Sequence, residues 1–158
     1  MIRDATEADR DRVRWLFEQM HGELLPMGGT VRPGARASAW VNDCFSVALE
    51  GEGACLVEDR DEEIVGVSLA IEMTFPYDLT LGDRMACGLG TYVDVAYRKC
   101  GVADGLYKAM KERLRGLGFG AYMGGYLAEN RAIQGLLQRN GAIEIERAIY
   151  FPLGGTAS

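Results

Sequence analysis

The chain has 158 residues, of which 48% are hydrophobic and 25% are charged, a composition that excludes a chain disordered throughout. Its formal net charge of −6 at pH 7 gives no overall attraction to nucleic acid or to an anionic membrane surface, so we expect neither as a partner. No segment approaches the about 20 apolar residues of a membrane span, and the charged N-terminus lacks an apolar signal core. We therefore expect a cytoplasmic protein with one domain over residues 1–158 and a flexible tail at 154–158.

The first part of the chain predicts a strand and a helix. Residues 1–5 suit a short strand, and Thr6 with Asp9 resembles a capping box that starts a helix. Gly22 and Pro26 are expected to end this helix. Its buried stripe is predicted from apolar residues at helical spacing: Val13, Leu16, Phe17 and Met20.

The remaining patterns alternate between helical and extended segments, which predicts an α/β or α+β domain with a mixed sheet. The predicted elements are a helix at 35–49, strands at 54–58 and 64–73 joined by a charged turn at 59–62, a loop at 75–83, a strand at 89–95, a helix at 101–117, a strand at 121–127, a helix at 130–140 and a last strand at 143–153.

The cysteines are isolated from one another in the sequence. They are Cys44, Cys55, Cys87 and Cys100. Since none belongs to a C-x-x-C pair, we predict free thiols and no zinc site. The chain has one histidine, His21, and we predict no bound metal.

Residues 93–103 suit a strand, a tight turn and the start of a helix, and their chemistry suits an anion. The first N–H groups of a helix have no partner inside the helix and carry the positive end of its dipole. Gly101 lets the turn approach a ligand closely, and Arg98 and Lys99 add positive charge. A pyrophosphate suits such a site. A plain helix start with two solvated cations is the alternative.

The same segment resembles a known acyl-CoA loop. The residues Arg98-Lys-Cys-Gly101-Val-Ala103 are similar to R/Q-x-x-G-x-G/A, the pyrophosphate loop of the GCN5-related N-acetyltransferase (GNAT) superfamily. The approach to this loop, residues 93–98, is similar to that family's V-[DH]-P-x-Y-R, and Asn130 matches an asparagine that opens a later helix in the family. The order of the predicted elements extends the resemblance over nearly the whole chain.

The resemblance implies a single GNAT-like domain with a mixed, mostly antiparallel central sheet and helices on both faces. A splayed pair of parallel strands would form the acyl-CoA cleft, with acetyl-CoA as the acyl donor. The pantetheine would pair with the backbone of the first splayed strand, and the pyrophosphate would bind the amides of the loop. The implied cofactor-binding residues are Tyr92, Val93 and Val95 for the pantetheine, Arg98, Lys99, Cys100, Gly101, Val102 and Ala103 for the pyrophosphate, and Asn130 for the pantetheine arm or the second strand.

The resemblance also implies acyl transfer to an amine. The amine must lose a proton before it attacks the thioester, and the leaving thiolate must gain one. Many relatives supply the second proton from a tyrosine near the end of the later helix, where this chain has Leu137. Tyr126 is our candidate acid and Glu72 our candidate base; a half-buried strand aromatic and a solvated edge carboxylate are the alternatives. His21 and Glu23 are candidates for lining the acceptor pocket.

We therefore predict an acetyl-CoA-dependent N-acetyltransferase that acts on a primary amine of a small molecule or a protein by direct attack on the thioester. The alternative is a catalytically inactive acyl-CoA-binding regulatory or interaction module, because the usual acid and base are missing. A binding protein without CoA is a third alternative. Only residues 142–158 follow Gly141, where the family continues into two strands, so we also expect an uncovered sheet edge and a homodimer.

Overall fold

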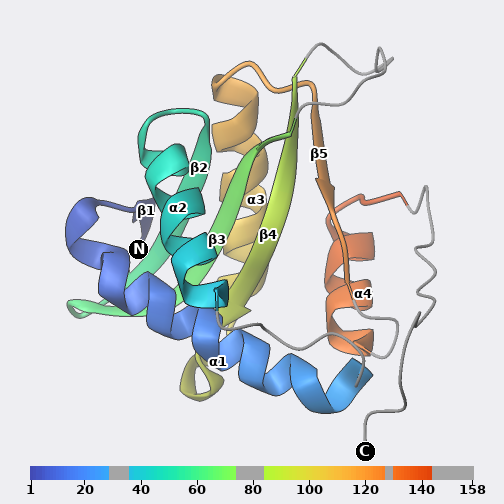
Figure 1. The fold of residues 1–158 in the computed structure, drawn as a ribbon. Helices are drawn as coiled ribbons and strands as arrows, with labels where there is room; N and C mark the ends of the chain where they lie inside the picture. The colour runs from blue at the N-terminus through green and yellow to red at the C-terminus, as the bar shows by residue number, and fades with distance from the viewer. Residues whose placement is uncertain (29–35, 74–83, 127–129, 144–158) are drawn as a thin grey trace, which may run out of the picture.

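A sheet of five strands, arranged in the order in which they occur along the chain, organises the residues that the computed structural model describes, namely 1–28, 36–73, 84–126 and 130–143 (Figure 1). Strands β1 to β4 pair antiparallel, whereas β4 and β5 pair parallel. The strands are β1 (Ile2–Asp4), β2 (Gly53–Arg60), β3 (Glu63–Met73), β4 (Met85–Val93) and β5 (Ala121–Gly124). The predicted fold class, a mixed and mostly antiparallel sheet with one parallel pair, is confirmed.

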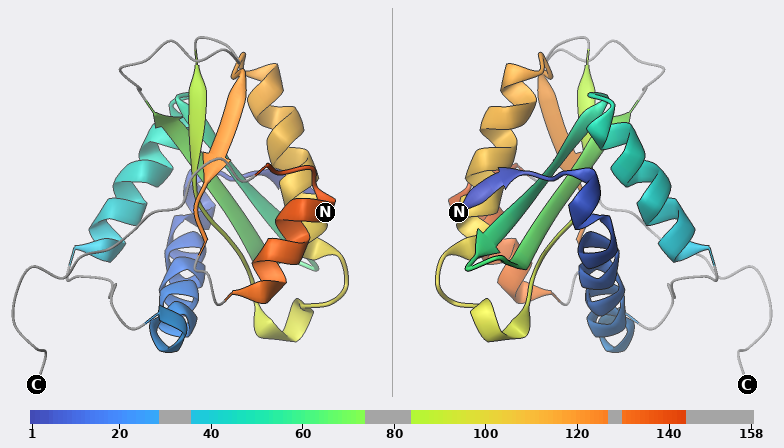
Figure 2. Two further views of the ribbon diagram at one scale, coloured as in Figure 1. Left: turned by 90° about the vertical axis from the view of Figure 1, so that its right-hand side faces the viewer. Right: turned by 90° about the vertical axis from the view of Figure 1, so that its left-hand side faces the viewer.

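Helices cover both faces of the sheet. Figure 2 shows α1 and α2 on one face and α3 and α4 on the other. The parallel β4–β5 pair needs a crossover connection, which α3 provides because it lies between these strands in the chain. The helices are α1 (Arg10–Gly28), α2 (Ala37–Leu49), α3 (Val102–Gly116) and α4 (Arg131–Arg139), with short 3₁₀ turns η1 (Glu7–Asp9) and η2 (Val95–Tyr97).

Each helical layer has its own apolar core against the sheet. Val67 and Leu69 of β3 belong to the core under α1 and α2, whereas Ala70 belongs to the core under α3. All three are fully buried, because β3 is the middle strand and has helices on both faces. The exception to this apolar run is Ser68, which is also fully buried.

The first helix is longer than predicted. It continues through Gly22 and Pro26 to Gly28, although both residue types disfavour helix interiors. Just after Gly22, the Glu23 carboxylate is bound by side chains from outside the helix, and these tertiary contacts offset the cost of the glycine. Pro26 lies in the last turns, where its missing N–H removes one hydrogen bond near the end. The prediction that Gly22 and Pro26 end the helix was therefore wrong.

Two strands near the predicted site end earlier than the sequence suggests. β4 stops at Val93, because the Asp94 side chain accepts a hydrogen bond from the Ala96 amide at 3.2 Å and closes a turn. Val95 therefore lies in η2 instead of the strand, and it is 63% exposed. β5 stops at Gly124.

Several predictions lie outside the described residues. These are the loop at 75–83, the last strand beyond residue 143 and the tail at 154–158. The four cysteines are free, as predicted. No described helix has the length and apolar character needed to cross a membrane.

Arg3 ties the first strand to the start of the first helix. Its guanidinium donates to both carboxylate oxygens of Asp9, at 2.8 and 3.0 Å. The same carboxylate accepts the Thr6 amide at 2.8 Å, as a capping box requires. The hydrogen bonds from Arg3, followed by those from Thr6, lower the pKa of Asp9 to about 2 against the opposing effect of burial.

We expect Asp9→Asn to lower the free energy of unfolding by about 2 kcal/mol at neutral pH, which follows from the difference between the folded pKa of about 2 and the ordinary value of 3.8. Because the folded-state pKa is the lower one, this contribution is complete above the ordinary pKa and is lost as the pH falls toward 2. Urea unfolding of both proteins at pH 7 and near pH 2 measures it. The control is Asp11→Asn, which removes an exposed carboxylate of the same helical turn. An equal difference at both pH values would contradict the prediction.

Candidate functional site

Strands β4 and β5 separate after a short paired segment. Their parallel pairing runs from Met85–Ala121 to Gly88–Gly124, after which β5 ends and β4 continues to Val93. Figure 1 shows the chain after β5 leading away from β4. Beyond Gly88, the β4 backbone keeps β3 as a partner on one side and has no described strand on the other.

β4 is also irregular where the strands separate. Its register with β3 skips Leu89, which makes this residue a β-bulge. Residues 87–91 are partly exposed, although β4 lies inside the sheet and both of its ends are buried. The divergence and the bulge together leave the middle of β4 accessible.

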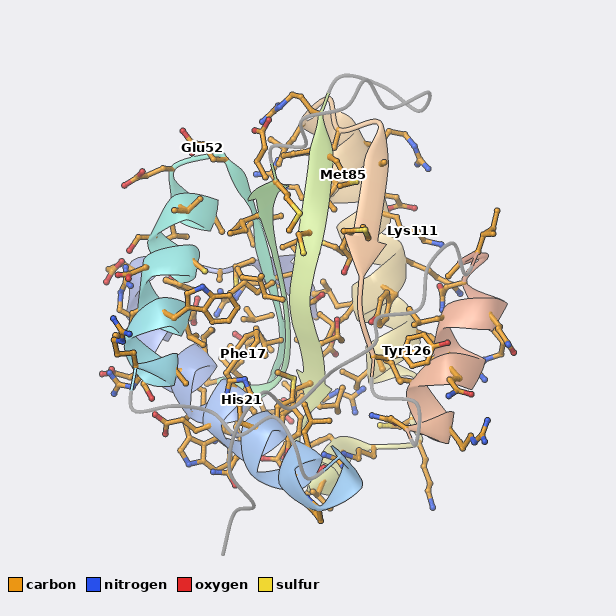
Figure 3. The ribbon with its side chains drawn as sticks, turned by 45° about the vertical axis from the view of Figure 1, so that its right-hand side comes forward. Phe17, His21, Glu52, Met85, Lys111 and Tyr126 are labelled. Atoms are coloured by element: carbon orange, nitrogen blue, oxygen red, sulfur yellow. The ribbon has the colours of Figure 1, made fainter. Side chains whose placement is uncertain are left out.

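The helix α1 packs directly on the bulge. A Cβ atom at Gly90 would lie 2.8 Å from Cε of Met20 and 3.1 Å from Cε1 of Phe17, so glycine allows this close approach. Figure 3 shows Phe17 and His21 next to each other on α1, and their ring centroids are 6.4 Å apart. Burial lowers the pKa of His21, which favours the neutral imidazole near neutral pH.

The C-terminal part of α1 also brings a carboxylate to the end of β4. Glu23 Oε1 accepts hydrogen bonds from the Tyr92 hydroxyl at 2.7 Å and from Arg98 Nη2 at 2.8 Å. The Arg98 guanidinium lies 5.0 Å from the centre of the Tyr92 ring, and its Nε donates to the Val93 carbonyl at 2.9 Å. Burial, followed by the Glu23 carboxylate, raises the pKa of Tyr92 to about 12. Arg98 thus links the segment before α3 to α1.

The segment between η2 and α3 has open backbone amides. Lys99 and Gly101 have left-handed backbone conformations, with φ of 64° and 83°. Within the described parts of the chain, the backbone amides of residues 99–104 donate no hydrogen bond. A Cβ atom at Gly101 would meet no other atom within 4 Å. This open turn at the N-terminus of a helix of 15 residues has the geometry that an anion requires.

The predicted cofactor-binding residues follow one another from β4 through η2 to α3, except for Asn130, which caps α4. Tyr92 and Val93 end β4, and the anion loop (Arg98, Lys99, Cys100, Gly101, Val102 and Ala103) follows within a short distance along the chain. Val95 lies between them in η2 with its side chain exposed. Asn130 lies apart, at the start of α4, where its Oδ1 accepts the Ile133 amide at 3.2 Å and caps the helix.

The two predicted catalytic residues lie near the ends of β3 and β5. Glu72 in β3 pairs with Ala86 of β4. Arg84 Nε donates to both carboxylate oxygens of Glu72 at 3.1 Å and lowers its pKa, which makes Glu72 a weaker base. Tyr126 follows the end of β5, is 40% exposed and lies toward α4 in Figure 3.

Two features of the site were missed by sequence reasoning. The bulge had an available signal, because Gly88 and Gly90 interrupt a strand, and glycine in a strand marks a bulge or a close backbone approach. The contact of Glu23 with Tyr92 and Arg98 had no local signal, since it joins residues that are far apart in the chain.

Residues 12–142 match the model of the acetyltransferase (GNAT) family. The chain belongs to this family. The matched segment contains the diverging strands, the bulge and the anion loop of this GNAT protein. A comparison with curated proteins finds no significant match.

Solved structures share the fold of this GNAT protein. A mutant of the BH1408 protein from Bacillus halodurans has a TM-score of 0.80 and 17% identity, covering 97% of this chain and 99% of that chain. The aminoglycoside N-acetyltransferase AAC(6')-Iy, in complex with CoA, has a TM-score of 0.73 and 18% identity, covering 98% and 100%. A ribosomal-protein-alanine N-acetyltransferase from Brucella melitensis biovar Abortus 2308 has a TM-score of 0.70 and 12% identity, covering 98% and 99%. At these identities the likeness concerns the fold alone.

We expect Gly90→Ala to lower the free energy of unfolding by about 1–3 kcal/mol, because its Cβ atom would overlap Met20 and Phe17. In a Met20→Ala background the same substitution is expected to cost clearly less, since its nearest neighbour has been removed. Urea unfolding of the two single variants and the double variant measures this coupling. Gly22→Ala is the control, because a Cβ atom there meets no other atom within 4 Å. Strictly additive effects would contradict the packing of α1 on the bulge.

Proposed function

We propose that this GNAT protein transfers the acetyl group of acetyl-CoA to a primary amine of a small molecule or a protein. The observation that carries the proposal is the combination of an open anion loop with the accessible side of β4, which no described strand pairs beyond Gly88, directly before it. Membership of an acetyltransferase family supports the reaction type. The CoA complex of a structural neighbour supports acetyl-CoA as the donor.

The anion loop suits the pyrophosphate of the donor. Its free amides and the positive end of the α3 dipole attract negative charge, and the exposed Lys99 adds a cation. Arg98 is less available, because its guanidinium is engaged by Glu23 and the Val93 carbonyl. The amide groups of the pantetheine would pair with the β4 backbone beyond Gly88, in place of the missing neighbouring strand.

The accessible part of β4 suits the thioester. A thioester placed beside the bulge would have backbone N–H groups of β4 near its carbonyl oxygen, where the negative charge of the tetrahedral intermediate develops. The amine would approach from the α1 side, where His21 and Glu23 lie. A neutral imidazole or a carboxylate there accepts the proton that the amine must lose, directly or through water.

The proposal is tested by titrating acetyl-CoA into the protein in a calorimeter. We expect micromolar binding by the wild-type chain and none by Gly101→Glu, because the substitution places a carboxylate where the pyrophosphate binds and a side chain at a φ of 83°. Gly116→Glu is the matched control, since it adds the same charge at the other end of α3, also in open space. Absence of binding by the wild-type chain would refute the proposed function.

The class of acceptor is tested by measuring CoA release with cationic amines of different size. The named activities of two structural neighbours suggest the panel: aminoglycosides and a peptide with an N-terminal alanine. For a cationic acceptor we expect Glu23→Gln to raise KM about tenfold, which corresponds to about 1.4 kcal/mol, because it removes a negative charge on the α1 side.

In the calorimetric titration, acetyl-CoA binding by Glu23→Gln should not weaken, because the substitution removes a negative charge next to Arg98 of the anion loop. Glu112→Gln is the control, since it removes an exposed carboxylate from α3 on the opposite face of the sheet. An equal effect of the two substitutions would show that net charge, and not the position of Glu23, decides acceptor binding.

The alternative function is an inactive acyl-CoA-binding module. It is suggested by Leu137, which occupies the position where many relatives have a tyrosine that acts as the general acid. Such a module would bind acetyl-CoA as described above and release no CoA with any amine. The two functions therefore differ in turnover alone.

A further inference from the structure

Arg98 connects the anion loop to the first helix. Its backbone begins the loop, but its side chain contacts α1 and β4. Its Nη2 donates to Oε1 of Glu23 at 2.8 Å, and its Nε donates to the Val93 carbonyl oxygen at 2.9 Å. A cation at the donor site is therefore paired with a carboxylate of α1.

Glu23 has a second partner, which is uncharged. The Tyr92 hydroxyl donates to the same Oε1 atom at 2.7 Å. Tyr92 is buried at the end of β4, and its pKa of about 12 keeps the hydroxyl protonated at neutral pH. If Arg98 turns away, the Tyr92 hydroxyl still holds the carboxylate at the end of β4. The carboxylate then keeps its position and loses its countercharge.

These two hydrogen bonds hold a part of α1 that packs loosely. The buried residues of the described part of α1 are Val13, Leu16 and Phe17, and none of residues 18–24 is buried. Figure 1 shows that α1 passes the end of β4, where Tyr92 and Arg98 reach Glu23. The partners of Glu23 therefore decide where its carboxylate lies and how much of its charge is compensated.

The contact between Arg98 and Glu23 can be exchanged at low cost. The two side chains are 38% and 37% exposed, and water screens an ion pair of this kind. A pyrophosphate on the loop amides carries more negative charge than one carboxylate, and it forms strong hydrogen bonds with a guanidinium. Because Nε is held by the Val93 carbonyl, only the Nη end of Arg98 has to turn toward the loop.

We propose that donor binding exposes the negative charge of Glu23 to the acceptor amine. The pyrophosphate attracts the Nη end of Arg98 away from Glu23, and the carboxylate remains on the Tyr92 hydroxyl without a countercharge. A protonated amine then supplies the missing positive charge. This inference rests on the proposed function, and it adds an electrostatic coupling between the donor site and the acceptor side.

The coupling defines a class of acceptor. In the free protein, Arg98 compensates Glu23, so a cation gains little there. In the donor complex the same carboxylate attracts a cation strongly. Linkage requires the reverse effect to be equal, so a cationic amine on Glu23 must strengthen donor binding by the same factor. The acceptor is therefore an amine that is protonated in solution, and an uncharged molecule does not produce this effect.

The first experiment is a calorimetric titration of CoA, which carries no acetyl group and so allows no turnover. It compares the wild-type chain, Glu23→Gln, Arg98→Gln and the double variant. We expect Glu23→Gln to bind CoA about fivefold more tightly, which corresponds to about 1 kcal/mol, the upper range for an exposed ion pair. In the Arg98→Gln background the same substitution should change CoA affinity less than about twofold, because the competition for Arg98 is gone.

Glu63→Gln is the matched control. Glu63 also accepts a hydrogen bond from a tyrosine hydroxyl, that of Tyr97 at 2.9 Å, and one from an arginine, that of Arg12 at 3.4 Å. It lies beside the segment that leads to the anion loop, but its arginine is not Arg98. We expect this substitution to leave CoA affinity within about twofold of wild type, since only screened charge is removed.

The second experiment repeats the CoA titration with a cationic probe. Primary ammonium chlorides from methylammonium to butylammonium are compared with sodium chloride at equal ionic strength. We expect at least one of these amines to tighten CoA binding by the wild-type chain and none to do so in Glu23→Gln. Equal CoA affinities of the wild-type chain in all the salts would overturn the assignment of Glu23 to the amine.

The remaining outcomes separate this inference from the proposed function. Unchanged or weaker CoA binding by Glu23→Gln would overturn the inference, because Glu23 would then orient Arg98 for the donor and not compete for it. Equal tightening by Glu63→Gln, or in the Arg98→Gln background, would also overturn it. In each of these cases the wild-type chain still binds CoA, and the donor site stands. If the wild-type chain binds no CoA, the proposed function itself fails.

Discussion

The early end of the β4–β5 pairing is the constraint on which the rest of the site depends. β5 stops at Gly124 while β4 runs on to Val93, so that beyond Gly88 no described strand pairs this side of the β4 backbone. Backbone N–H and C=O groups lower stability when they are buried and unpaired, and the partial exposure of residues 87–91 avoids that cost. The same groups are then available to an extended ligand that carries amides of its own, such as pantetheine.

Because of the bulge at Leu89, the two neighbouring glycines of β4 face opposite sides of the sheet. Gly88 makes room for the Tyr122 hydroxyl on the α3 side, and Gly90 makes room for Met20 and Phe17 on the α1 side. In a regular strand, residues two apart point to the same face, and the extra residue of the bulge reverses this for Gly88 and Gly90. Side chains from both helical layers thereby approach the same short stretch of β4.

The ion pair of Arg98 and Glu23 connects these two sides. Arg98 belongs to the anion loop, yet its guanidinium contacts α1 and the Tyr92 ring. Both partners are more than one third exposed, so the pair contributes little to stability. The ion pair instead fixes a position, since it holds the C-terminal part of α1 and its Glu23 carboxylate next to the end of β4.

Local patterns in the sequence predict the type and order of the described elements and the fold class, and they place a glycine-containing turn before α3. Helical spacing in Val13, Leu16 and Phe17, and the glycine before α3, are local patterns whose physical causes lie within a few residues. Only the folded chain shows where β4 and β5 part, why α1 continues past Gly22, and which side chain lies against Gly88. These features depend on pairing and packing between segments far apart in the chain, whose energies exceed the local preferences of glycine and proline. No local pattern contains that information.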